Sequence, residues 1–385
     1  MTDDERRARL AVRHALAPAY RADSPEAATR ALTVLHATEP ATIYLSCRAR
    51  VTGFEIADLD RALYAERSLV KQLAMRRTLF VFPRELLPAV WPSASARVAV
   101  SLRARLVKQI VRAGLAVDGA DWLDRASAGV LGALADIPEG RSAVDLRADV
   151  PILDFKTVTW PNGVLSSSNV LVYLGVTGDV VRGTNTGRWH VSRPRWTLMR
   201  HWLGDVPSSL SPVEGYRELV RRWLHTFGPG TEDDIVWWLG STKTAVRAAL
   251  RELEAVRVSL DGGGVGLLLP DDLGEVPDPG PWVALLPVLD ATVMGWQGRD
   301  FYLGPHGGQV FDNRGNAGTT AWADGRIVGC WVQDEAGVVE VRLLESVPAR
   351  TRRALDAEAA RLTEWLENLR VASVYRSPAM KIATD

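Results

Sequence analysis

The sequence predicts an α+β protein with three tandem winged helix-turn-helix units, a C-terminal β-rich region and a terminal helix. Three stretches each have the pattern of a helix, a turn, a basic helix and a β-hairpin. Residues 282–347 then change to short runs of β-forming residues, with the hairpin signal Asp324-Gly325 between two of them. Leucines at helical spacing after Pro348 indicate the last helix. The expected units are 1–92, 93–210, 211–275 and 276–385.

The first unit is expected to begin with helices up to His36, followed by a helix with an acidic start after Gly53. Residues 68–74 are predicted to add a further helical turn or two. Residues 78–82 are rich in β-forming residues and stop at Pro83, so they are predicted to be a wing strand. Two predicted DNA contacts precede this strand, Arg76 and Arg77.

The second unit is longer and its pattern is less regular. Residues 93–136 are predicted to be helical, and a short helix is expected to open at Ser142. Residues 151–169 contain prolines, serines and an Asn-Gly pair, so they are predicted to be a loop. The apolar run 170–174 fits either a recognition helix or a buried segment, because short apolar runs do not distinguish the two.

The third unit has the clearest pattern. Thr231 begins a short apolar helix, Gly240 ends it, and Ser241 is expected to cap a second helix. Two apolar strands follow around a glycine-rich turn, at 256–260 and 265–269. A winged helix places its second helix in the major groove of DNA, while the hairpin touches the backbone. The basic stripe of this second helix is therefore predicted to contact DNA, through Lys243, Arg247 and Arg251.

Acidic residues are absent from two stretches, 86–117 and 180–204, although the net charge of the chain is zero. In the second stretch arginines alternate with tryptophans, and strands at 176–180 and 189–191 are expected to frame a wing there. Basic residues mixed with aromatic ones are typical of surfaces that bind phosphates. The alternative is arginine-rich coding, since only five of the 46 basic residues are lysines. The predicted DNA contacts here are Arg182, Arg188, Trp189, Arg193 and Arg195. Both interpretations stay open for the first stretch, which carries Arg97, Arg103, Arg105, Lys108 and Arg112.

Composition narrows the class of protein. Apolar residues make up 47% and charged residues 24% of the chain, which is ordinary for a globular protein. No apolar run is long enough to cross a bilayer, and the first residues lack the apolar core of a signal peptide. Cys47 and Cys330 form no metal-binding or redox spacing, and the histidines show none either. We therefore expect a cytoplasmic, nucleoid-associated monomer without a metal or other cofactor.

Four segments carry a resemblance to a known family, at 68–83, 227–238, 286–299 and 324–331. They resemble, in the same order, the winged-helix DNA-binding proteins that include the AlkZ- and YcaQ-like DNA glycosylases, some of which act on interstrand crosslinks. The resemblance implies tandem winged helices with a C-terminal β-rich region. It also implies binding of double-stranded DNA and hydrolysis of the N-glycosidic bond of alkylated or crosslinked purines.

The family's active site is a polar pair at positions i and i+2 after an early helix, either Gln-x-Gln or Gln-x-Asp. The matching positions here are His36-Ala37-Thr38, so neither glutamine is present. Neutral His36 could accept a proton from water and Thr38 could orient that water. Glu39 would point the other way unless the chain turns before Pro40. Arg48 follows close behind and is a further candidate for phosphate contact.

Other interpretations of the same residues remain. His36 could bond the terminal carbonyls of a helix, with Thr38 capping a chain reversal. The missing glutamines favour a DNA-binding protein without catalysis, either a lesion sensor or a transcriptional regulator. A long chain with no ligand-sensor domain favours a DNA repair glycosylase. RNA binding is a third possibility, but no RNA-module signature accompanies it.

Overall fold

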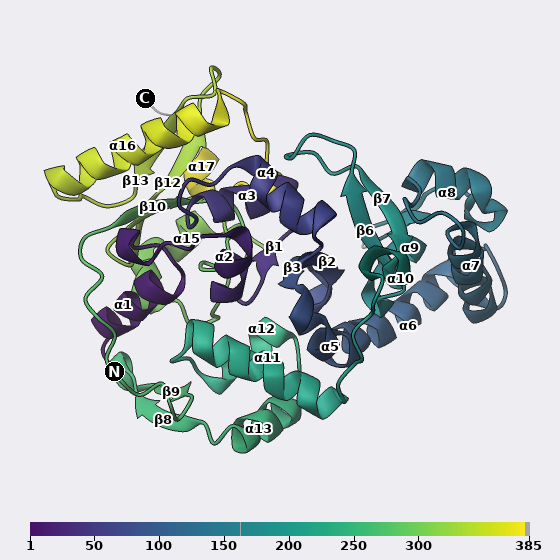
Figure 1. Ribbon diagram of the computed structural model, residues 1–385, viewed down its shortest axis with the longest axis horizontal. Coiled ribbons are helices and arrows are strands. Elements are labelled where there is room, and N and C mark those ends of the chain that lie inside the picture. Colours follow the sequence, from purple (N-terminus) through teal and green to yellow (C-terminus); the bar gives the residue numbers. More distant parts are fainter. Residues whose placement is uncertain (162, 382–385) are drawn as a thin grey trace.

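The computed structural model describes residues 1–161 and 163–381 and confirms the α+β class. Figure 1 shows the N-terminal elements in the middle of the molecule, the following elements at the right and the next group at the bottom. The C-terminal sheet and helix lie at the upper left. The strands of the described chain form one three-stranded sheet, one four-stranded sheet and three two-stranded hairpins.

The first group surrounds the three-stranded antiparallel sheet, whose order is β1-β3-β2. Its elements are α1 (Asp3–Arg13), α2 (Pro25–Ala31), β1 (Leu35–His36), α3 (Pro40–Arg48), α4 (Ile56–Asp60), β2 (Leu69–Leu73) and β3 (Leu79–Pro83). The wing strand predicted at 78–82 is confirmed as β3. The helical turn predicted over 68–74 is wrong, because these residues form β2 and pair with β3. Both faces of β2 are largely buried, so the strand lacks the alternation that would have identified it.

The second group begins with the long helix α6 and ends in a hairpin. Its elements are α5 (Leu87–Val90), α6 (Ala96–Arg112), α7 (Gly119–Ala133), α8 (Ala143–Asp149), β4 (Val158–Trp160), β5 (Gly163–Leu165), α9 (Ser168–Thr177), β6 (Val180–Asn185), β7 (Pro194–Leu198) and α10 (Met199–Leu203). The run 170–174 belongs to a buried helix, α9. The loop predicted at 151–169 is wrong in part, because β4 and β5 pair there; Asn162 lies outside the described residues. The hairpin strands are β6 and β7 rather than 176–180 and 189–191, because α9 continues to Thr177 and both strands begin about five residues later than expected.

The third group places a hairpin after three helices. Its elements are α11 (Pro212–Phe227), α12 (Glu232–Leu239), α13 (Lys243–Glu252), β8 (Val256–Ser259) and β9 (Val265–Leu268). Thr231 caps α12, as predicted, by accepting a hydrogen bond from the Asp234 N–H. Gly240 ends α12 with a positive φ of 59°. Thr242, rather than Ser241, caps α13, because its hydroxyl accepts from the Ala245 N–H.

The C-terminal group is the four-stranded sheet, in the order β10-β11-β12-β13, with α16 packed on it. Its elements are β10 (Val283–Leu286), α14 (Asp300–Leu303), α15 (Gly307–Val310), β11 (Thr320–Ala323), β12 (Arg326–Gln333), β13 (Val339–Leu343), α16 (Ala349–Leu366) and α17 (Pro378–Lys381). Ala379 and Met380 of α17 are buried. Residues 382–385 lie outside the described residues.

One hydrophobic core runs through all four groups. It contains Phe80 from the first group, Trp202 from the second, Trp223 from the third and Trp322 from the C-terminal sheet. The groups therefore pack on one another directly through this core, and further hydrophobic clusters lie beside it. No helix of the described chain is long and apolar enough to span a membrane.

Candidate active site and nucleic-acid interface

His36 lies on the short strand β1, opposite Phe80 of β3. Its neighbours Leu35 and Ala37 point into the core. Strand β1 ends at His36, and Thr38 lies two residues further on in a bend of the chain. His36 is only 7% exposed, whereas Thr38 is exposed. The predicted pair is thus a buried imidazole followed by an exposed hydroxyl outside the strand.

The His36 ring is neutral at physiological pH. Burial, together with the charge of Arg76, lowers its pKa to about 3 against a smaller opposing effect of Asp290. The ring packs edge-on against Phe80, with centroids 5.3 Å apart. Its Nδ1 is buried and has no hydrogen-bond partner within the described residues, so the ring does not bond a helix-end carbonyl through this nitrogen.

Asp290 is a structural carboxylate. It pairs with Arg50 at 2.7 Å, and both side chains are fully buried. It also accepts hydrogen bonds from the Ser46 hydroxyl at 2.6 Å and the Thr292 N–H at 2.9 Å. This network joins the end of α3 to the turn after β10. Asp290 therefore acts on His36 only through its charge.

Glu39 is directed away from the His36 face. The chain bends at Thr38 and Glu39 before α3 begins at Pro40, but this bend does not bring the Glu39 carboxylate to His36. The Glu39 carboxylate accepts hydrogen bonds from the Ser373 hydroxyl at 3.3 Å and the Val374 N–H at 3.2 Å. The structure therefore links Glu39 to the C-terminal segment and does not bring it together with His36.

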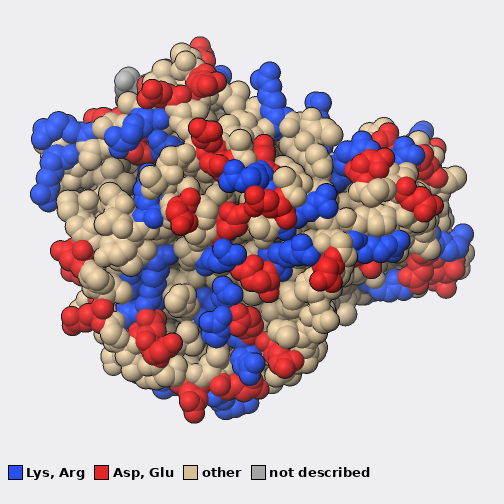
Figure 2. Space-filling model, in the orientation of Figure 1, with Lys and Arg blue, Asp and Glu red and all other residues tan. Residues whose placement is uncertain are grey.

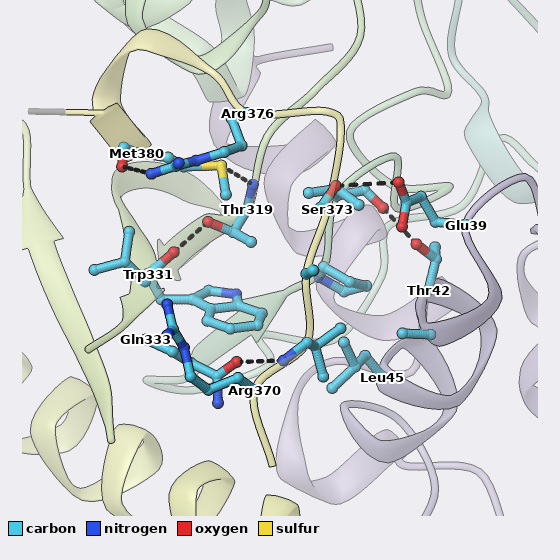
Figure 3. A pocket seen from close by; sticks show the side chains of 16 residues that line it. Glu39, Thr42, Leu45, Thr319, Trp331, Gln333, Arg370, Ser373, Arg376 and Met380 are labelled. Carbon is cyan, nitrogen blue, oxygen red and sulfur yellow. Dashed lines mark hydrogen bonds between the residues drawn. The ribbon is translucent and has the colours of Figure 1, made fainter. Parts of the chain in front are cut away.

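A cavity of about 470 Å³ lies between α3, the four-stranded sheet and the segment 370–376 (Figure 3). Glu39 and Ser373 point toward each other from two of its walls. Trp331 and Leu45 supply apolar surface, and neither His36 nor Thr38 lines the cavity. The cavity is thus a feature of the α3–sheet junction and does not include His36.

Arg76 belongs to a cationic and aromatic cluster at the junction of the first and third groups. The Arg76 guanidinium lies 4.1 Å from the ring centroid of Trp237, and Arg299 lies 4.9 Å from the same ring. Burial, together with the charge of Arg299, lowers the pKa of Arg76 to about 10. Arg299 also lies 4.2 Å from the Phe311 ring. Neither guanidinium forms an ion pair with a carboxylate of the described chain, so this positive charge is not neutralised.

Several predicted DNA contacts have partners inside the protein. Arg48 forms an ion pair with Glu358 of α16, with only 12% of its side chain exposed. Trp189 packs 5.3 Å from Tyr44 and 5.6 Å from Trp365, measured between ring centroids. Other partners are the Trp196 ring for Arg182 and the Glu139 carbonyl for Arg195. Contact with DNA would require these side chains to leave their present positions.

The predicted stripe on α13 is mostly neutralised. Lys243 lies 2.7 Å from Asp233, and Arg247 lies 2.8 Å from Glu232. Four predicted contacts are exposed and have no carboxylate partner in the described chain, Arg77, Arg188, Arg193 and Arg251. Figure 2 shows lysine and arginine side chains in a band across the middle of this face, with acidic side chains scattered beside it.

Trp237 and Arg299 were not identified from the sequence as site residues. Each ends or nearly ends one of the family-like segments, 227–238 and 286–299. Nothing in the residue pattern indicated that these two positions meet, because the contact joins α12 to a loop before α14. No group of three or more His, Cys, Asp or Glu side chains in the described chain could hold a metal ion.

Comparison with known proteins gives a family and a similar solved structure. The family model "DNA glycosylase AlkZ-like" matches residues 29–365. The structure of the Streptomyces sahachiroi DNA glycosylase AlkZ is similar to this chain with a TM-score of 0.74 and 19% sequence identity. The similarity covers 94% of this chain and 97% of that one, and at this identity it shows a shared fold. No curated protein is similar enough in sequence to count as a match.

Proposed function

Since this chain belongs to the AlkZ-like family of DNA glycosylases, we propose that it excises alkylated or crosslinked purines from double-stranded DNA. The reaction would hydrolyse the N-glycosidic bond. Water adds to C1′ of the deoxyribose, and the electrons of the C1′–N bond leave with the base. The single observation that supports catalysis is a neutral, unpartnered imidazole at the family's first active-site position.

His36 is proposed to hold the attacking water by accepting a hydrogen bond from it. A pKa of about 3 makes the ring a weak base but leaves it an uncharged acceptor. The family's glutamine amides are also uncharged hydrogen-bond acceptors, so a neutral histidine at this position keeps both the zero charge and the ability to accept a hydrogen bond. Thr38, two residues further along the chain and exposed, is proposed to orient the water through its hydroxyl. Glu39 is assigned no part in this step, because its carboxylate bonds the C-terminal segment.

This weak assistance suits a cationic lesion. An N7- or N3-alkylated purine already carries a positive charge, so it departs as a neutral base without a general acid. The barrier that remains is the desolvation and positioning of water at C1′. A neutral acceptor is sufficient for this task, whereas a carboxylate would be needed for a poorer leaving group.

The duplex is proposed to bind through tandem winged helices. Each of the first three groups has helices followed by an antiparallel hairpin, β2-β3, β6-β7 or β8-β9. In a winged helix this arrangement directs one helix into the major groove and the hairpin toward the backbone. The exposed Arg188, Arg193 and Arg251 are proposed to contact phosphates.

The test is release of 7-methylguanine from a modified duplex under single turnover with protein in excess. We expect wild type to release the base and His36→Ala to do so at least about tenfold more slowly, some 1.4 kcal/mol of barrier. His36→Gln, which introduces the family's residue, should retain most of the rate. No release by wild type from either 7-methylguanine or a crosslinked duplex, with binding intact, would favour the second candidate, a lesion sensor or regulator. The absence of both family glutamines is the observation in favour of that candidate.

A further inference from the structure

Helix α6 carries a straight basic stripe. Its buried positions, Val98, Leu102, Leu106 and Ile110, form one face. With about 100° per residue, the basic side chains and Ser101 fall within an arc of about 80° on an adjoining face. The members of this stripe are Arg97, Ser101, Arg105, Lys108 and Arg112.

The four cations of the stripe have no carboxylate partner in the described chain. Arg97 donates to the Gly240 carbonyl at 3.0 Å, and Arg112 lies 5.2 Å from the Trp160 ring centroid. The Arg105 Nε is buried without a partner. Arg103 shows the contrast, because it lies on another face of the same helix and pairs with Asp124 at 2.8 Å. Positive charge is thus neutralised on one side of α6 and left uncompensated on the other.

The stripe continues into the turn between β2 and β3. Arg76 and Arg77 occupy this turn with positive φ values of 54° and 63°. A groove of about 670 Å³ lies between the turn and the start of α6, lined by Arg76, Arg77, Arg97, Val98, Val100, Ser101 and Gly240. Arg105 lies close enough to Arg77 for its charge to lower the pKa of that residue, although burial is the larger cause. The turn and the helix therefore form one continuous cationic surface.

We propose that this surface is a phosphate-binding track that holds one strand of the DNA duplex next to the candidate active site. The inference rests on the proposed function in taking DNA as the substrate. Arg97 and Arg112 lie 15 positions apart on α6, which is about 22 Å of helix axis. The rise of about 3.4 Å per phosphate is measured along the duplex axis, and the path along one strand is about twice as long, so about three phosphates lie along this length. Guanidinium groups without internal partners match phosphates in both charge and geometry.

The track leads to the candidate active site through Arg76. The charge of Arg76 acts on the His36 ring, and its guanidinium stacks on Trp237. A phosphate bound at Arg76 would therefore offset the positive charge beside His36. Binding of the backbone would in this way raise the pKa of His36 and strengthen it as a hydrogen-bond acceptor.

The test compares two triple variants that lose the same charge. The track variant is Arg105→Gln/Lys108→Gln/Arg112→Gln. The control variant, Arg103→Gln/Arg125→Gln/Arg352→Gln, removes three exposed arginines that pair with Asp124, Asp121 and Asp356. Fluorescence anisotropy with an unmodified duplex, at several KCl concentrations, gives the slope of log K against log salt for each protein.

The slope is negative, and we expect its magnitude to fall by about one for each phosphate contact that is lost. The expected fall is therefore about three in the track variant. The control should keep the wild-type slope and affinity to within about threefold, because exposed ion pairs contribute little. Single-turnover release of 7-methylguanine at saturating protein should be unchanged in the control variant, whose residues belong neither to the track nor to the candidate active site. Circular dichroism melting curves that match wild type would exclude misfolding.

Equal slopes for the track variant and the control would overturn the track and leave the proposed function standing. A wild-type protein that does not bind duplex DNA would instead overturn the proposed function. Anionic vesicles of phosphatidylserine and a single-stranded RNA serve as competitors. If either competitor, at an equal concentration of charge, displaces the duplex from wild type but does not bind the track variant, the surface binds another polyanion and the proposal of a DNA track is overturned.

Discussion

At the scale of single residues, the neutral state of His36 and His14 makes the fold sensitive to acid. Burial lowers the pKa of each to about 3, from an ordinary value of 6.5. Below pH 6.5 the unfolded chain therefore takes up protons that the folded chain does not. The free energy of unfolding must decrease as pH falls from about 6.5 toward 3, with a slope of up to about 1.4 kcal/mol per unit for each ring.

The variant His36→Gln separates this effect from other titrations. We expect its free energy of unfolding to lie below that of wild type at pH 7, because packing against Phe80 is lost. The difference in the free energy of unfolding between wild type and the variant should be smaller at pH 5 than at pH 7 by more than about 1 kcal/mol, since the glutamine does not titrate. Urea unfolding at both pH values measures the gap. A difference in unfolding free energy that is the same at both pH values would mean that His36 takes up its proton in the folded protein as readily as in the unfolded chain.

Thr38 gives a second prediction at this scale. The variant His36→Gln/Thr38→Gln restores the pair that the family resemblance implies at these two positions. We expect it to release 7-methylguanine at least as fast as wild type, whereas His36→Ala/Thr38→Ala should lose tenfold or more. A rate that remains at wild-type level in the alanine pair would remove both residues from the mechanism.

At the scale of elements, the end of α12 controls the position of Arg76. Gly240 has a φ of 59°, and a Cβ added there would lie 2.9 Å from Arg76 Cγ. Gly114, after α6, has a similar φ of 71° but no atom within 4 Å of an added Cβ. Alanine at either position should cost about 1–2 kcal/mol through the left-handed backbone. Only Gly240→Ala should also displace Arg76.

Duplex affinity distinguishes these two variants. We expect Gly240→Ala to weaken binding several-fold and Gly114→Ala to leave it unchanged, with similar losses of stability in urea. Equal affinities would show that the β2–β3 turn does not need its present position to bind DNA.

The elements differ in how well the sequence predicts them. Helix α12 was predictable because its cap at Thr231 and its stop at Gly240 are local chemistry. Strand β2 was not, because its pairing with β3 and the burial of both its faces come from distant residues. The α6 stripe was visible as a run without acids, but its meaning depended on which arginines find partners. Only the folded structure shows which arginines pair with a carboxylate.

At the scale of the whole molecule, the ion pair of Arg50 and Asp290 joins the first group to the C-terminal sheet. Both side chains are fully buried. Removing one partner leaves the other charge without compensation, so Arg50→Leu should destabilise the fold by about 3–5 kcal/mol. The exposed pair of Arg30 and Glu85, at 2.7 Å, is the control, and Arg30→Leu should cost less than about 1 kcal/mol.

Chemical unfolding of these variants measures both losses. The double variant Arg50→Leu/Asp290→Leu should recover part of the stability, because no unpaired charge then remains. Equal losses from Arg50→Leu and Arg30→Leu would mean that the buried pair does not connect the groups energetically.

The hydrogen bonds between Glu39 and the segment Ser373–Val374 can form only at the end of protein synthesis. A chain leaving the ribosome builds β1 and α3 early, because their contacts with β3 need only the first 83 residues. The hydrogen-bond donors of the Glu39 carboxylate, Ser373 and Val374, are synthesised more than 300 residues later. At typical rates of about 5–20 residues per second that delay is tens of seconds. Ala41 and Leu45 of α3, which pack against the C-terminal sheet in the finished protein, therefore stay uncovered through most of synthesis and form an apolar surface on which chaperones can act.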